Sequence, residues 1–264
     1  MSRLPRLSLI LAFAILALVT PVLRAAEGAV TAAPAPSSLI FVGFVGGFVR
    51  HDNPHHGPVL LAKRLRQTAP KDAYIEVFEN RHRKAAYKKI LQVLDRDRDG
   101  TLSEAEKSQA RIVLFGQSWG GSAVVLLARE LARIGIPVLL TVQIDSVAKF
   151  WQKDRVIPDN VAAAANFYQP HGFIHGRSQI TAADPARTEI LGNYRFDYKE
   201  TPVRCKGMSW YDHVITPGHM QTECDPRLWG QVEDLVRARI ELNSTIVAAA
   251  PVSENDAPSV TNPR

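Results

Sequence analysis

A serine between two glycines, in GQSWG (116–120), is the feature of this sequence best suited to chemistry. The pattern G-x-S-x-G holds a serine hydroxyl on a tight turn whose flanking glycines leave it uncovered. An apolar, β-prone run, RIVLFG (111–116), leads into the turn, and an amphipathic helical pattern, SAVVLLARELARIG (122–135), leads out. Because this motif forms a nucleophile in a strand-turn-helix context, we interpret Ser118 as a nucleophile.

A serine hydroxyl needs a neighbouring base, and the base needs an orienting acid, in the chain order serine, acid, histidine. Asp145 ends the apolar run PVLLTVQID (137–145), and His219 lies in what we expect to be a loop before the last helix. We therefore predict Asp145 as the acid and His219 as the base. The alternatives are His213, His171 and His175 for the base, and Asp184 and Asp197 for the acid.

Acyl chemistry at Ser118 would also need donors for the oxyanion that forms. Turning the chain into a helix directly after the serine points the Trp119 amide at that position. A second donor is expected from Gly46 and Gly47, in GFVGGF (43–48) at the end of the first strand, where backbone amides can approach closely. A glycine-rich strand end serving only a turn is the alternative.

A second motif, DRDRDGTLSEAE (95–106), matches an EF-hand calcium loop at every constrained position. Gly100 allows its sharp turn. The predicted ligands are Asp95, Asp97, Asp99, Thr101 through its carbonyl, Ser103 and Glu106. Because sensor hands come in pairs and this loop is single, we expect a structural Ca²⁺ rather than a switch; the alternative is an acidic turn that binds nothing.

The elements that must position these groups alternate between β-prone runs and amphipathic helical stretches. Strands are predicted at 39–45, 74–80, 111–116 and 137–145, and helices at 58–67, 83–94, 122–135 and 225–242. Near-continuous apolar strands favour a parallel sheet covered on both faces. The predicted fold class is α/β, one domain over 39–242 with a mainly parallel sheet, helices on both faces, and an EF-hand-like insertion (95–106) before the nucleophile strand.

The two ends of the chain differ from its middle in composition and lack its alternation of strand and helix patterns. Residues 1–26 have the pattern of a signal peptide, with Arg3 and Arg6 before a short apolar run, so we expect export to the periplasm or medium and no stable membrane insertion. Residues 27–38 and 243–264 are predicted to be a flexible linker and a disordered tail. In an oxidising compartment, Cys205 and Cys224 become candidates for one disulfide, unless both stay as thiols.

Net charge and histidine spacing give little support to two other kinds of site, one for nucleic acid and one for a transition metal. The formal charge of +6 falls to +3 once the three arginines of residues 1–26 are removed, which is too mild to indicate a nucleic-acid partner. The histidines of VRHDNPHHG (49–57) match no standard zinc spacing, and a loop beside the active site explains them as well as a metal site does.

Residues 111–146 resemble the nucleophile-to-acid segment of thioesterase domains in the α/β-hydrolase superfamily. The resemblance is close over that segment and otherwise rests on strand order and the late histidine. It implies the roles of Ser118, Asp145 and His219, and hydrolysis of a small-molecule acyl ester or thioester through an acyl-enzyme. Gln117 departs from the family, which often carries His there, and export shifts the expectation toward oxygen esters. A non-catalytic calcium-binding protein and an acyltransferase are the competing hypotheses.

Overall fold

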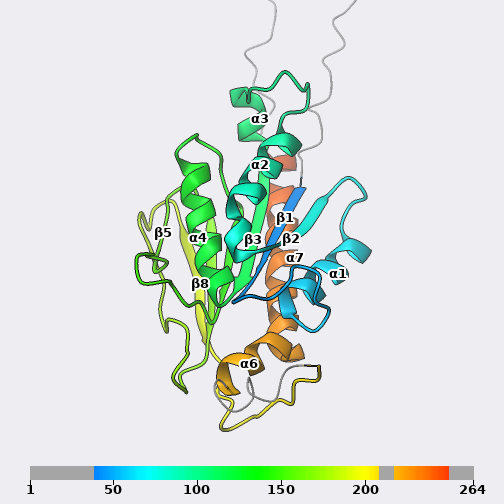
Figure 1. Ribbon diagram of the computed structural model, residues 1–264. Coiled ribbons are helices and arrows are strands. Elements are labelled where there is room, and N and C mark those ends of the chain that lie inside the picture. The colour runs from blue at the N-terminus through cyan, green and yellow to red at the C-terminus, as the bar shows by residue number, and fades with distance from the viewer. Residues whose placement is uncertain (1–38, 208–216, 250–264) are drawn as a thin grey trace, which may run out of the picture. The chain divides into compact units, whose positions relative to one another are not determined.

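The computed structural model describes residues 39–207 and 217–249 (Figure 1). The expected signal peptide (1–26), the expected linker (27–38) and His213 lie outside the described residues. No helix in the described part combines the length and the apolar character needed to cross a bilayer.

One parallel sheet forms the centre of the domain, with its strands in the order β2-β1-β3-β4-β6-β8. The strands are β1 (Leu39–Val45), β2 (Tyr74–Glu79), β3 (Arg111–Gln117), β4 (Leu140–Ile144), β6 (Ala163–Tyr168) and β8 (Glu189–Arg195). A separate parallel pair joins β5 (Val156–Ile157) to β7 (Thr181–Ala182). Because β1, β3 and β4 are buried along their lengths, their apolar runs can face helices on both sides.

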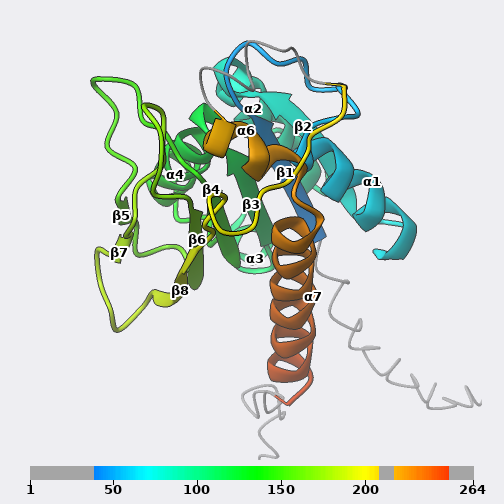
Figure 2. The same cartoon turned by 90° about the horizontal axis from the view of Figure 1, so that it is seen from below.

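Helices cover both faces of this sheet (Figure 2). On β3, Ile112 and Leu114 join the core cluster of α2 (Arg83–Leu94) and α4 (Trp119–Ala132). The alternate residues Val113 and Phe115 join the cluster of α1 (Gly57–Thr68) and α7 (Pro226–Ala249). The fold class predicted from the sequence, a mainly parallel sheet with helices on both faces, is therefore confirmed.

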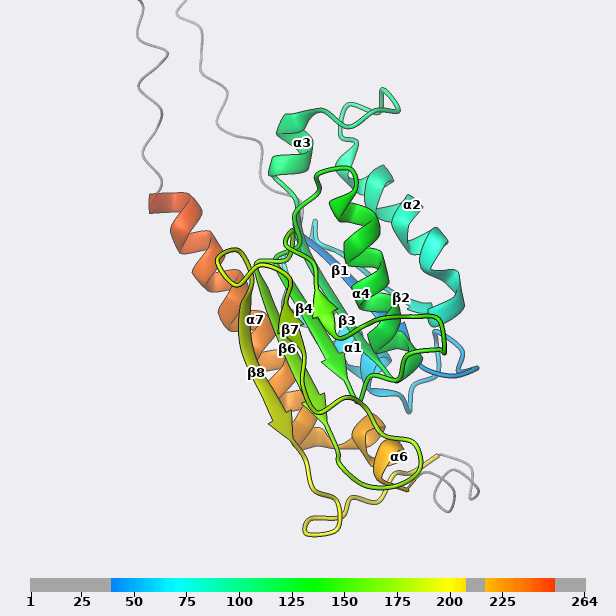
Figure 3. The ribbon, with the colours of Figure 1, turned by 90° about the vertical axis from the view of Figure 1, so that its left-hand side faces the viewer.

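Different elements lie at the two ends of the parallel strands, which form two edges of the sheet (Figures 1 and 3). The loop 95–103 and the short helix α3 (Glu104–Ser108) precede β3 and lie at the edge where the parallel strands begin. Helix α6 (Pro217–Cys224) lies at the opposite edge, where the strands end. In open α/β sheets ligands bind at the edge where the strands end, so α6 belongs to the functional side of the domain.

The end of the closing helix and two strands of the sheet differ from the prediction. The closing helix α7 continues to Ala249, so residues 243–249 of the expected tail are helical, and residues 250–264 lie outside the described part. The helical pattern of 225–242 gave no stop signal near Leu242. Strands β6 and β8 were not predicted, because the alanine run of β6 and the polar, partly exposed β8 lack a strong strand pattern.

Cys205 and Cys224 form a disulfide, which was the first of the two alternatives predicted from the sequence; the other was a pair of free thiols. It joins the last residue of α6 to the segment that follows β8. A cross-link of this kind stabilises mainly by restricting the unfolded chain, typically by ~2–4 kcal/mol. It also limits how far α6 can move from the sheet edge.

Candidate active site

Ser118 lies on a strained turn between β3 and α4. Its φ of 56° and ψ of −127° belong to a region that residues other than glycine rarely occupy. The turn is tight enough that a Cβ on Gly120 would overlap the carbonyl oxygen of Phe44. The tight turn expected from the motif is therefore present, with a glycine where β1 and α4 meet.

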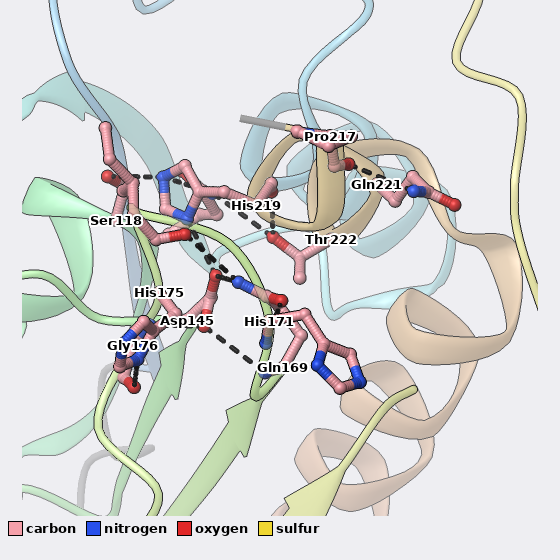
Figure 4. A network of polar contacts seen from close by, with 12 residues as sticks. Ser118, Asp145, Gln169, His171, His175, Gly176, Pro217, His219, Gln221 and Thr222 are labelled. Carbon is pink, nitrogen blue, oxygen red and sulfur yellow. Dashed lines mark hydrogen bonds and ion pairs between the residues drawn. The ribbon is translucent and has the colours of Figure 1, made fainter. Parts of the chain in front are cut away.

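Ser118, His219 and Asp145 form one hydrogen-bonded chain at the edge where the strands end (Figure 4). The Ser118 Oγ lies 2.9 Å from His219 Nε2, and His219 Nδ1 lies 2.7 Å from Asp145 Oδ2. All three side chains are buried. His219 stands inside helix α6 rather than in the loop that we expected, because Pro217 and Gly218 begin the helix instead of breaking the chain.

The Asp145 carboxylate is fully buried and is held by backbone and side-chain donors. Its Oδ1 accepts from Gly176 N at 2.6 Å and from Gln169 N at 3.3 Å, and its Oδ2 accepts from Gln169 Nε2 at 3.1 Å. A buried carboxylate is tolerated only when its lone pairs are satisfied in this way. The sequence did not reveal Gln169 and Gly176, since both follow the unpredicted strand β6.

Gln117 links the nucleophile strand to the histidine helix. Its Nε2 lies 3.4 Å from His219 Nε2 and donates to Thr222 Oγ1 at 3.2 Å. Thr222 in turn donates to the His219 carbonyl at 2.7 Å. The residue before the serine, singled out only as a departure from the family pattern, thus contacts the predicted base.

Glu223 attaches α6 to the start of α1. Its Oε2 accepts from Gly57 N at 3.3 Å, and its Oε1 lies 3.1 Å from His56 Nδ1, with both side chains buried. Because His219 and Glu223 are four residues apart, they share one face of α6. Together with the disulfide at Cys224, this contact fixes the helix that carries His219.

A cleft of about 750 Å³ opens over Ser118. Its apolar lining includes Phe48, Val49, Trp119, Val147, Phe173 and Met220. The three residues predicted as an oxyanion hole, Gly46, Gly47 and Trp119, all line this cleft with Ser118. Gly46 lies against Ser118, because a Cβ on Gly46 would be 2.7 Å from Ser118 Cβ. Trp119 is the first residue of α4, where a helix leaves its backbone N–H groups unpaired.

The rival acids and bases in the described residues have other partners. His171 Nε2 lies 2.9 Å from both carboxylate oxygens of Asp197, and this hydrogen bond lowers the pKa of Asp197. Asp184 caps a turn by accepting from Ala186 N. His175 lines the cleft, but its ring contacts the Gly176 carbonyl. The structure therefore brings only His219 and Asp145 to Ser118 among the candidates it describes.

The predicted calcium loop gathers three carboxylates. Ligand oxygens of Asp95, Asp97 and Asp99 lie within 4.8 Å of one another, and Gly100 has a φ of 84°. The Asp95 Oδ1 atom is buried without a hydrogen-bond partner, whereas Oδ2 accepts from Gly100 N. A buried oxygen without a hydrogen-bond donor, in a loop that gathers three carboxylates, fits a bound cation.

Glu106 and Ser103 close the other side of this loop in a reciprocal helix cap. Ser103 Oγ accepts from Glu106 N, while the Glu106 carboxylate accepts from the Ser103 and Arg96 backbones. The hydrogen bonds from Arg96 and Ser103 lower the pKa of Glu106. Its carboxylate is not part of the three-residue cluster, so calcium binding would require its oxygens to exchange these donors for the ion.

The chain matches no protein-family model and no curated protein. It is similar, at low identity, to solved structures of two proteins from biosynthetic pathways and of an esterase. The RedJ thioesterase of the prodiginine pathway in Streptomyces coelicolor is 11% identical, with a TM-score of 0.34 over 62% of this chain and 83% of that one. ClbQ of the colibactin pathway is 9% identical, with a TM-score of 0.40 over 79% of this chain and 100% of that one. An acetylxylan esterase is 11% identical, with a TM-score of 0.36 over 77% of this chain and 98% of that one.

Proposed function

We propose that this chain is an exported serine hydrolase that cleaves carboxylic ester or thioester bonds through an acyl-enzyme at Ser118. The observation that carries the proposal is the hydrogen-bonded chain Ser118, His219, Asp145 at the end of β3. A histidine within 2.9 Å of a serine hydroxyl on a strained turn has the geometry of a general base beside its nucleophile. The paired cysteines agree with export to an oxidising compartment.

In the first half of the reaction, Ser118 Oγ attacks the acyl carbon while His219 Nε2 takes the hydroxyl proton. The oxyanion would be bound by the Trp119 amide, at the start of α4, with a backbone amide of Gly46 or Gly47 as the second donor. Collapse of the intermediate breaks the ester or thioester bond, and His219 donates its proton to the departing alcohol or thiol. Ser118 is left acylated.

The second half releases the acid. His219 takes a proton from a water that attacks the acyl carbon, and the returning proton regenerates the Ser118 hydroxyl. Asp145 keeps His219 in the tautomer with the proton on Nδ1 and stabilises the imidazolium in both halves. The apolar side chains of the cleft favour an acyl group with a sizeable hydrocarbon part.

A fluorophosphonate probe tests the nucleophile directly. The expected result is one covalent adduct on the exported protein, located at Ser118 by peptide mass spectrometry. The Ser118→Ala variant is the matched control and should not react. A panel of oxygen esters and thioesters, each with and without an alcohol acceptor, then assigns the reaction. An unlabelled wild-type protein would refute the hydrolase, and product formed only with the acceptor would make it an acyltransferase.

Replacing Gly176 with alanine is expected to lower kcat by ~100-fold, the scale of a misplacement of about 1 Å. The new Cβ would overlap the Asp145 backbone and lie 2.6 Å from its Oδ1, so the acid must shift away from His219. Steady-state kinetics and thermal unfolding measure the effect. The control is Gly172→Ala on the same loop, where φ is 89° but the Cβ would meet only Ile174 O at 3.9 Å. Equal losses of kcat in the two variants would contradict the role of Gly176.

We also propose a structural Ca²⁺ in the loop 95–106. The side chains of Asp95, Asp97, Asp99, Ser103 and Glu106 and the Thr101 carbonyl would hold it. The three-carboxylate cluster and the buried Asp95 Oδ1 support this ligand set. Bound calcium would compensate the mutual repulsion of the carboxylates and fix the connection between α2 and β3. The loop lies at the edge of the sheet opposite the cleft, which favours a stabilising role over a catalytic one.

Calcium is expected to raise the melting temperature of the wild-type protein. At a hundredfold excess over Kd the gain is ~2.7 kcal/mol, which corresponds to roughly 5–11 °C for a domain of this size. Titration calorimetry and thermal unfolding with calcium or chelator measure it. Asp95→Ala and Glu106→Gln should abolish both signals. Glu104→Gln is the control, because this exposed acid pairs with Lys107 and is not a predicted ligand. Unchanged heats in Asp95→Ala would remove the site.

A further inference from the structure

Four large aromatic side chains are exposed on loops that leave the end of the sheet where the cleft opens. Phe150 is fully exposed, and the exposed fractions of Phe173, Phe48 and Trp151 are 94%, 83% and 77%. Scattered single apolar residues are normal on a protein surface. Four of the largest on neighbouring loops are not, because exposed apolar groups gathered on one part of a surface usually mark an interaction site.

The four side chains belong to three loops that leave the same edge of the sheet. Phe48 follows β1, Phe150 and Trp151 follow β4, and Phe173 follows β6. Since β1 and β4 flank β3, and β6 adjoins β4, these loops surround the end of the strand that carries Ser118. Figure 3 shows the loops after β4 and β6 reaching the edge where α6 lies.

Trp119 connects the loops after β1 and β4. The Phe48 ring stands edge-on to the Trp119 ring with centroids 5.5 Å apart, and Lys149 Nζ lies 4.8 Å above the Trp119 ring. Phe48, Trp119 and Phe173 also line the cleft itself. Phe48, Trp119 and Phe173 thus lie at the cleft, and Lys149 brings the loop of Phe150 and Trp151 to Trp119. We call these five side chains the aromatic rim (Phe48, Trp119, Phe150, Trp151 and Phe173).

The charges beside the aromatic rim are mainly positive. The loop after β4 carries Lys149, Lys153 and Arg155, and the latter two are exposed. Its two acids, Asp145 and Asp154, are both fully buried, and Asp154 accepts hydrogen bonds from Ser146 and Arg177. The exposed face of this loop thus presents aromatic rings and cations without a compensating exposed carboxylate of its own.

We propose that the aromatic rim docks this protein reversibly on an anionic lipid surface, with Phe150 and Trp151 inserted at the level of the headgroups. Aromatic rings favour the membrane interface, and each nearby Lys or Arg adds attraction to anionic headgroups. Docking in this orientation turns the cleft toward the lipid, so an acyl ester could enter from the bilayer. That lipid-borne substrate rests on the hydrolase proposed above, whereas the docking itself does not.

Vesicle co-sedimentation of the Ser118→Ala protein tests docking without turnover. Every variant is purified as the exported protein, with the same N-terminus in each case. It is then mixed with vesicles of phosphatidylcholine, alone or with phosphatidylglycerol. Binding is expected with the anionic vesicles, weakening as salt rises. The double substitution Phe150→Ser with Trp151→Ser should weaken it by about tenfold or more, since two aromatic side chains lose their apolar contact. The control, Leu242→Ser, removes an exposed apolar side chain from α7 and should bind as the parent does.

Several outcomes would overturn docking. These are no binding to anionic vesicles, equal binding by the double variant and the Leu242→Ser control, or a lipid-free dimer that the double substitution dissociates. The last result would assign the aromatic rim to a second copy of the chain. Hydrolysis of a short water-soluble ester separates this failure from failure of the proposed function. The double variant made in the protein that keeps Ser118 should hydrolyse this ester as the wild-type protein does. If the wild-type protein hydrolyses the ester but does not bind anionic vesicles, only the docking proposal is refuted.

Discussion

Replacing Ser118 with alanine is expected to lower kcat by about 10⁴-fold or more, with little change in KM or in the free energy of unfolding. Loss of a serine nucleophile removes the acyl-enzyme route, and only the acceleration from binding and oxyanion donors remains. Alanine keeps the cleft and can adopt the same turn at no greater steric cost than serine. The measurement is steady-state hydrolysis of whichever ester the wild-type protein cleaves fastest, with thermal unfolding alongside.

The matched control for this variant is Ser122→Ala, one turn further along α4. Ser122 is also buried, and its Oγ donates to Gln152 Oε1 at 3.0 Å without contacting His219. Its loss should cost about 1 kcal/mol of stability and leave kcat within a few-fold. If Ser118→Ala kept more than about a tenth of the wild-type kcat, attack would come from another group and the mechanism would be wrong.

The fold was predictable where strands are apolar and helices amphipathic. The first strand was predicted at 39–45 and observed as Leu39–Val45, and the second helix was predicted at 83–94 and observed as Arg83–Leu94. Both signals come from burial, which selects residue types at a fixed period. In the second half of the chain this signal weakens. Strand β6 begins with three alanines, which fit a strand packed closely on both faces but carry no β preference of their own.

The candidate site divides along the same line. The turn at Ser118 was predictable because its geometry is local, and Asp145 followed because it ends the next apolar strand. His219 was predicted from chain order, although its helix was not, since Pro217 and Gly218 indicate a loop when read by themselves. The contacts of Gln169 and Gly176 with Asp145 depend on how β6 pairs with β4, so no short pattern could reveal them.

The last expectation concerns the acid. Replacing Asp145 with asparagine should lower kcat by ~10⁴-fold, the size of effect known for a triad acid whose loss leaves the histidine in the wrong tautomer.

The neighbours of Asp145 explain why. Two backbone N–H groups, of Gly176 and Gln169, point at Oδ1 and cannot turn away, so the amide oxygen of the variant must take that position. Its NH₂ group then faces His219 Nδ1 and donates to it, which moves the ring proton to Nε2. A protonated Nε2 cannot accept the proton of Ser118.

Asp197→Asn provides the matched control, because Asp197 makes a similar contact with His171 away from the cleft serine. The expected order is a large loss of kcat for Asp145→Asn, with KM nearly unchanged, and a change of a few-fold at most for Asp197→Asn. The melting temperature of each variant distinguishes a misplaced proton from a damaged fold. A larger loss of activity in Asp197→Asn would show that the catalytic pair is His171 and Asp197. It would refute the proposed role of the hydrogen-bonded chain through His219.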